Sequence, residues 1–163
     1  MSDGQKIRWT ATPSNAMSAE EIERFLSEPH VACLATNRAD GFPHLSPIWF
    51  LYEGGVAFFE LAQSRIHLAN LRRDPRASLM VELDERPAHG WRAAVRGVVL
   101  RGPVELIDDE ATVTGYGERI DGRYLGSELH DPAFAEATEP ERYTLARLAP
   151  STCVSWDFRK TDG

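Results

Sequence analysis

Cysteine and lysine are both scarce in this chain of 163 residues. Its two cysteines, Cys33 and Cys153, are too few for a disulfide framework or for a zinc site built on thiolates, so we expect both to be small buried side chains. Lysine occurs only at Lys6 and Lys160, and all other basic residues are arginines. An anion bound by a side chain would therefore meet arginine, whose planar guanidinium pairs with phosphate oxygens two at a time.

Long apolar segments and an excess of positive charge are missing as well. No run approaches the roughly 20 apolar residues of a transmembrane helix, and residues 1–17 lack the apolar centre of a secretion signal, so the sequence predicts a cytoplasmic protein with no membrane contact. The formal net charge of −7 argues against binding to nucleic acid, which requires a basic face. The length predicts one domain over residues 18–163, preceded by an N-terminal arm over residues 1–17.

The sequence motifs of common catalytic sites are not found. The chain contains no GxSxG, no HExxH and no phosphate-binding P-loop. Its five histidines are scattered, and none is paired at the spacing of metal ligands on one expected element, so we expect no metal ion. The sequence therefore assigns no residue a catalytic role.

Short strands separated by turn residues dominate what is present. Strand patterns cover residues 30–36, 43–52, 56–61, 76–83, 91–101, 104–107, 142–148 and 153–158. We expect the first three to form a meander, and Gly102 and Pro103 to turn the chain between two later ones. Because strands follow one another through short turns, the pattern favours a mainly β fold, with an antiparallel sheet that closes into a small barrel, over a doubly wound parallel sheet.

Short helices interrupt the strand pattern in three places. Ser18 and Glu21 form a capping box at the start of the first helix. A second helix is expected over residues 64–73, with Ser64 as its cap, and a third over residues 108–120.

The start of the second helix is the first candidate binding site. A helix N-terminus presents unpaired N–H groups, and Ser64 and Arg65 placed there could cradle a phosphate. Alternatively, Ser64 only caps the helix and Arg65 is solvated, and the local pattern by itself favours this simpler interpretation.

Aromatic residues gather on two neighbouring expected strands. Alternation sends Phe50 and Tyr52 to one face of their strand and Trp49 to the other, while Phe58 and Phe59 lie on the next strand. We expect most of these rings to fill the core. A flat heteroaromatic ligand would nevertheless find a wall between two such strands.

Four segments carry a resemblance to a known family: EEIERFL, VACLATNRADGFPHLSPIWFLYEGG, SRIHLANLRRDPRASLMVE and VRGVVLRGPVELIDD. In this order they resemble the pyridoxamine 5′-phosphate oxidase-like family of flavin-binding split barrels, including its branch that uses the deazaflavin coenzyme F-420. The resemblance implies a six-stranded antiparallel split β-barrel with short peripheral helices. It also implies a homodimer with two cofactor sites at the subunit interface.

The resemblance further implies roles for individual residues. The strand around Trp49 would lie along the cofactor ring, and Ser64 and Arg65 would take the phosphate. Asn70 would fix the helix that follows, and the last two residues named below would reach the partner subunit's cofactor. The complete set of cofactor-binding residues implied in this way is Ser46, Pro47, Ile48, Trp49, Glu60, Leu61, Ala62, Ser64, Arg65, His67, Asn70, Trp91 and Arg92.

Two positions depart from the pattern of this family. His67 stands where many relatives carry a lysine that contacts the phosphate, and Ile66 stands where an arginine is common. A neutral imidazole holds a dianion less well than an ammonium group, so Arg65 would carry more of the charge.

The function implied by the resemblance is that of an oxidoreductase. It would transfer a hydride, through bound FMN or coenzyme F-420, to an unidentified small organic substrate. The alternative is a non-catalytic carrier that holds flavin or haem in the same barrel, which the histidine at position 67 favours. An oxidase specific for vitamin B6 ranks third, because no recognisable C-terminal substrate segment of that enzyme is found.

Overall fold

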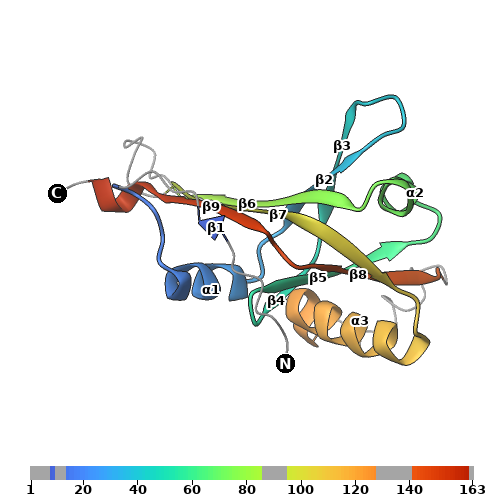
Figure 1. The fold of residues 1–163 in the computed structure, drawn as a ribbon. Helices are drawn as coiled ribbons and strands as arrows, with labels where there is room; N and C mark the ends of the chain where they lie inside the picture. The colour runs from blue at the N-terminus through green and yellow to red at the C-terminus, as the bar shows by residue number, and fades with distance from the viewer. Residues whose placement is uncertain (1–7, 10–13, 86–94, 128–140, 162–163) are drawn as a thin grey trace, which may run out of the picture.

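The computed structural model describes residues 8–9, 14–85, 95–127 and 141–161, and Figure 1 shows how they are arranged. The strands within these ranges are β1 (Arg8–Trp9), β2 (Ala32–Asn37), β3 (Pro43–Ile48), β4 (Leu51–Glu53), β5 (Val56–Ala62), β6 (Arg76–Asp84), β7 (Val95–Ile107), β8 (Tyr143–Leu148) and β9 (Thr152–Asp157). The helices of the same ranges are α1 (Ala19–Ser27), α2 (Ile66–Arg73), α3 (Glu110–Leu125) and a final 3-10 turn over Phe158–Thr161.

The strands form one system in the order β3-β2-β6-β7-β8-β5-β4. Every ladder along this order is antiparallel, β9 pairs with β7, and the short β1 runs parallel to β9. The long β7 joins two halves, because its N-terminal part pairs with β6 and β9 while residues 104–107 pair with β8. The prediction of a mainly β, antiparallel fold is confirmed, although the described residues hold more strands than the six that the family resemblance implies.

The expected strand over residues 43–52 is interrupted. β3 pairs with β2, whereas β4 pairs with β5, so the chain crosses from one half of the sheet to the other between Ile48 and Leu51. The predicted meander of three strands is therefore wrong. Pro47 lies on β3, which is an edge strand of the described order, as a residue without a backbone N–H requires.

The expected turn at Gly102 and Pro103 is also wrong. β7 runs through both residues without a break, and they pair with Ala77 and Arg76 of β6. A Cβ atom at position 102 would lie 2.5 Å from the carbonyl oxygen of Ala149, so glycine is needed here for the close approach of the β8–β9 connection. The glycine reflects tight packing of two chain segments, and the backbone around it stays extended.

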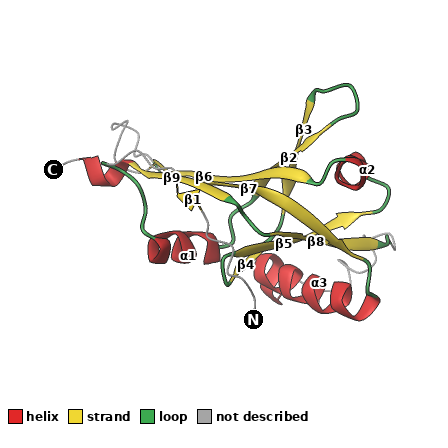
Figure 2. Ribbon diagram, viewed as in Figure 1, coloured by secondary structure: helices red, strands yellow, loops and turns green. Residues whose placement is uncertain are grey.

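The helices cover one side and one end of the strands. Figure 2 shows α1 and α3 on the same side, with α3 against β5 and β8, while α2 lies at one end near β2 and β5. None of the helices in the described ranges is both long and apolar enough to span a membrane. The position of α3 places a helix from late in the chain over β5 and β8, near the β4 end of the strand order.

The first helix begins as the sequence predicts. The Ser18 hydroxyl accepts a hydrogen bond from the Glu21 N–H at 3.2 Å, and the Glu21 carboxylate accepts one from the Ser18 N–H at 2.6 Å. The buried face of this helix, which includes Phe25, packs into the same core as Phe50 and Phe59. Burial of these large rings contributes much of the hydrophobic stabilisation.

The N-terminal arm lies along β9. Its carbonyl at Asn15 accepts a hydrogen bond from the Asp157 N–H at 2.7 Å, and the Met17 N–H donates to the Ser155 hydroxyl at 3.1 Å. Met17 is buried in the core, so this part of the arm belongs to the folded body. Of the two cysteines, Cys153 is buried as expected, whereas Cys33 is only partly buried, so the expectation for it is wrong.

Candidate functional site

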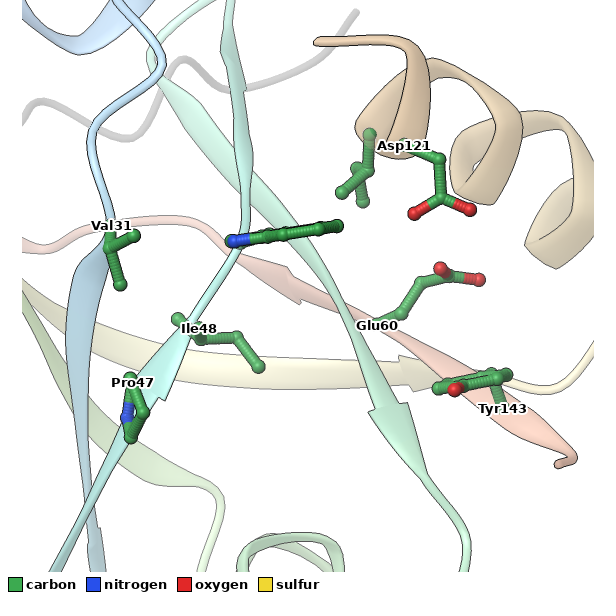
Figure 3. Close-up of a pocket in the computed structure, with 8 residues that line it drawn as sticks. Val31, Pro47, Ile48, Glu60, Asp121 and Tyr143 are labelled. Carbon is green, nitrogen blue, oxygen red and sulfur yellow. The ribbon is translucent and has the colours of Figure 1, made fainter. Parts of the chain in front are cut away.

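A cavity of about 480 Å³ opens where the end of β3, β5, β8 and α3 meet, and Figure 3 shows its walls. This volume lies in the range of small-molecule sites in proteins. The lining residues are Val31, Pro47, Ile48, Trp49, Glu60, Ile120, Asp121 and Tyr143. Apolar side chains from the β2–β3 side therefore face polar and acidic ones from β5, β8 and α3.

The indole of Trp49 forms one wall of this cavity and is held from behind by α3. Its ring stacks on the ring of Tyr124, with the centroids 4.8 Å apart and the planes within 2° of parallel. Phe50 and Tyr52 are buried, whereas 37% of Trp49 is exposed, so alternation assigned the faces of these residues correctly. The local sequence pattern around Trp49 gave no sign of Tyr124, because this residue belongs to α3, which comes much later in the chain.

The last turn of α3 is attached firmly to the segment that carries Trp49. The Tyr124 hydroxyl donates to the His30 carbonyl at 2.7 Å and accepts from the Phe50 N–H at 3.3 Å. The Arg123 guanidinium donates to the Phe50 carbonyl at 2.9 Å and to the Leu26 carbonyl at 2.8 Å. These contacts fix the orientation of the Trp49 wall relative to α1 and α3.

Two carboxyl groups face each other on the opposite wall. Figure 3 shows the side chains of Glu60, on β5, and Asp121, on α3, pointing toward one another. Burial, followed by the negative charge of Asp121, raises the pKa of Glu60 to about 7, and burial also raises the pKa of Asp121. The helix comes close because Gly117 has no side chain: a Cβ atom there would lie 2.7 Å from Glu60 Oε1.

A polar group continues the site along β3 toward α2. The Ser46 hydroxyl lies 3.0 Å from His44 Nε2 and 3.3 Å from His67 Nδ1. His67 is buried, and its Nε2 has no hydrogen-bond partner among the described residues. Burial, then the nearby His44 and Arg65, lowers the pKa of His67, so its imidazole is neutral around neutral pH.

The connection from β5 to α2 differs from its expected form. The residue at the helix N-cap is Arg65, which makes no side-chain capping bond, so the assignment of Ser64 as the cap is wrong. The Ser64 hydroxyl instead donates to the Glu141 carboxylate, across a large distance in sequence. Arg65 is exposed, and its guanidinium forms no hydrogen bond or ion pair with any residue that the structure describes.

Three further predicted site residues are buried and lie outside the lining of the cavity. Asn70 is buried on α2, and its amide donates to the Thr36 hydroxyl of β2 at 3.1 Å, which ties the helix to the sheet. Leu61 and Ala62 are buried at the end of β5. Trp91 and Arg92 lie outside the described residues.

The sequence model of the pyridoxamine 5′-phosphate oxidase family matches residues 18–157. The chain belongs to this family. One relative, a pyridoxine/pyridoxamine 5′-phosphate oxidase of Thermobifida fusca (strain YX), is 32% identical over 142 residues, which cover 83% of this chain and 59% of that protein. The chain therefore spans only part of the length of this curated relative.

Solved structures share the family fold. The conserved hypothetical protein Rv2991 of Mycobacterium tuberculosis has a TM-score of 0.77 at 27% identity, over 93% of this chain and 92% of that one. An F-420 reductase has a TM-score of 0.61 at 25% identity, over 80% of this chain and 94% of that one. These likenesses agree with the split barrel that the sequence motifs imply.

The structure brings only part of the predicted set to one place. Pro47, Ile48, Trp49 and Glu60 line the cavity, and Ser46 follows them along β3 to His67. The sequence analysis missed four residues of the lining, which are Val31, Ile120, Asp121 and Tyr143. The four family motifs quoted above do not cover Ile120 and Asp121, and no local pattern signals that α3 and the start of β8 meet the strand of Glu60.

Proposed function

We propose that this member of the family is an oxidoreductase that binds FMN or coenzyme F-420. The observation that carries the proposal is the order of residues along β3: Pro47 and Ile48 line the cavity beside Trp49, and the hydroxyl of the preceding Ser46 lies 3.3 Å from His67 Nδ1 at the start of α2. An extended ligand with a planar ring at one end and a phosphate at the other matches this succession of an apolar cavity and a polar end.

The polar end fits a phosphate in two respects. The buried Nε2 of His67 lacks a partner among the described residues, and a buried polar atom without a partner is costly. Arg65 stands beside it at the N-cap of α2, where the first backbone N–H groups of a helix can donate hydrogen bonds to an anion. The two groups together offer a charged donor and a neutral donor to phosphate oxygens.

The residues of the cavity would orient the ring and limit the access of water. When bound, such a cofactor supplies the hydride chemistry, and the protein supplies position and electrostatics. The Trp49 wall is rigid because Tyr124 stacks behind it, so the ring would meet a preformed surface.

Titration of the purified protein with each cofactor tests this proposal. We expect one of the two to bind in the micromolar range, with a shifted visible spectrum and a quenched Trp49 emission, and we expect Trp49→Leu to weaken binding. Phe158→Leu, a change at an exposed aromatic side chain outside the cavity, is the control. Failure of both cofactors to bind at this level would contradict the proposal.

A non-catalytic carrier of flavin or haem is the second candidate. The neutral His67 favours it, because this side chain offers a phosphate less charge than the lysine common in the family. The same titration separates the two functions. A Soret band after addition of haem, without reduction of any bound flavin by a hydride donor, would favour the carrier.

We also propose that the protein is a homodimer with the site at its interface. β3 is an edge strand, and the outer face of β3, β2 and β6 exposes Leu45 to 62% and Met80 to 40%, with Val31 also exposed beside the cavity. An open edge next to an apolar face usually pairs with a second chain. Figure 1 shows the β2–β3 hairpin extending away from the rest of the body.

Sedimentation measurements test the dimer. We expect the unmodified protein to sediment as a dimer and Leu45→Glu to sediment as a monomer, because a buried unpaired carboxylate opposes association. Ala111→Glu adds the same charge on the exposed side of α3 and should leave the dimer intact. A monomeric unmodified protein at micromolar concentration would refute this proposal.

A further inference from the structure

The cavity beside Trp49 has two chemically different sides. Val31, Pro47 and Ile48 form an apolar side together with the indole, as Figure 3 shows for the three labelled residues. Glu60 and Asp121 form the other side. A ligand that fills this space would present an apolar plane to one side and a polar edge to the other.

Among the described residues, the lining of the cavity beside Trp49 contains two carboxyl groups and no basic side chain. Neither Glu60 nor Asp121 forms an ion pair with any residue that the structure describes, and the charge that acts on Glu60 is the like charge of Asp121. A second cavity of about 440 Å³ shares Glu60, Asp121 and Tyr143 with the first. Its remaining ionisable lining residues are Asp108, Glu110, Glu118, Glu141 and Arg142.

This arrangement creates a negative potential in a partly buried place. Two carboxylates that face each other without a cation repel one another, and low dielectric strengthens the repulsion. The repulsion is relieved either by a proton or by a positively charged ligand. An anionic ligand group would be disfavoured at the same position.

We propose that Glu60 and Asp121 determine substrate specificity, by selecting a planar substrate with a positively charged nitrogen group that lies against the two carboxylates. This inference rests on the proposed function, since it names the substrate class for the same cavity. The cofactor ring would lie along β3, and the substrate would approach from α3, where the carboxylates are. A delocalised cation such as an amidinium donates parallel hydrogen bonds to carboxylates and packs its flat face on an aromatic ring.

The selection depends on pH in a definite direction. Because the pKa of Glu60 is about 7, this carboxyl carries its charge at about pH 8 and loses it at about pH 6. Cation binding therefore weakens as the pH falls. The titratable and charged groups that line the two cavities with Glu60 are Asp121, Glu110 and Glu118 of α3, Tyr143, Glu141 and Arg142 at the start of β8, and Asp108 before α3, whose carboxylate accepts a bond from Thr144.

Three isosteric probes test the proposal without any cofactor: benzamidinium, benzamide and benzoate, which differ in charge at nearly constant shape. By calorimetry with the purified protein at about pH 8, we expect benzamidinium to bind about tenfold more tightly than benzamide, and benzoate to bind most weakly. At about pH 6 the preference should shrink severalfold. Equal affinity of the three probes, or no binding of benzamidinium, would overturn the proposal.

Neutral isosteric variants test whether Glu60 and Asp121 cause the preference for benzamidinium. We expect Glu60→Gln and Asp121→Asn each to reduce the preference for benzamidinium several-fold, and the double variant to remove it together with its pH dependence. Both changes preserve shape, and thermal denaturation confirms folding. Glu20→Gln, on the exposed side of α1 and outside both cavities, removes one charge as a control and should keep the full preference.

The outcomes distinguish this inference from the proposed function. Selection of benzamidinium by a protein that binds neither FMN nor coenzyme F-420 would refute the proposed oxidoreductase function. It would still support the selection of a cation by Glu60 and Asp121. Binding of a cofactor without any selection among the probes would refute the specificity alone. A preference that persists in the double variant would show that other groups select the cation.

Discussion

Replacing Arg123 with alanine is expected to lower the free energy of unfolding by about 3 kcal/mol, because three carbonyl groups lose a partly buried, charged donor at once. The guanidinium donates to the carbonyls of Leu26, Glu28 and Phe50, and it packs over the Phe50 ring at 4.8 Å from the centroid. It thus connects the end of α1, the β3–β4 link and α3. Urea denaturation followed by tryptophan fluorescence measures the loss.

A second arginine on the same helix supplies the matched control. Arg119, four positions earlier, is half-exposed and pairs with Glu53 at the surface. Such exposed pairs contribute only about 0–1 kcal/mol, so Arg119→Ala should have a small effect. Equal losses in the two variants would contradict the structural role given to Arg123.

Replacing Arg65 with alanine is expected to raise the dissociation constant of the bound cofactor by about 10- to 100-fold, the effect of losing a charge-assisted contact to a phosphate. The effect should be large because the neighbouring His67 is neutral at neutral pH and the lysine common in this family is absent. Arg65 is thus the main source of positive charge at this end of the site. Fluorescence titration with FMN or coenzyme F-420 measures the change.

Two further variants serve as controls for the Arg65→Ala measurement. Arg72→Ala removes another exposed guanidinium, from the other end of α2, and it should leave affinity nearly unchanged. Arg65→Lys should recover part of the affinity, because lysine keeps the charge but loses the paired geometry of the guanidinium. An unchanged dissociation constant in Arg65→Ala would remove this residue from the site.

Some features of the fold could be predicted because they depend on neighbours in sequence. The capping box needs only Ser18 and Glu21, which are three residues apart, and both of its hydrogen bonds are present. The burial of Phe50 and the exposure of Trp49 match the alternation expected from an extended chain, although both residues lie in the link between β3 and β4. Turn residues between short strands likewise indicated an antiparallel, mainly β fold.

Other expectations were wrong where distant segments decide the outcome. Serine is a residue type that often caps helices, yet the hydroxyl of Ser64 donates to Glu141, 77 residues later. Glycine is common in turns, yet Gly102 lies in a continuous strand, where the β8–β9 connection approaches it closely. In both cases a tertiary contact outweighed a local preference that is worth only about 1 kcal/mol.

The amino-acid sequence by itself determined the strand-rich pattern, the first helix start and, through its motifs, membership of the family. Only the tertiary structure decided which groups meet in the cavity, since Trp49, Glu60, Asp121 and Tyr143 come from four separate segments. Local periodicity reports which face of an element is buried, but it does not report which other element covers that face. That choice arises from packing of the whole chain, and here it placed the carboxyl of α3 opposite the carboxyl of β5.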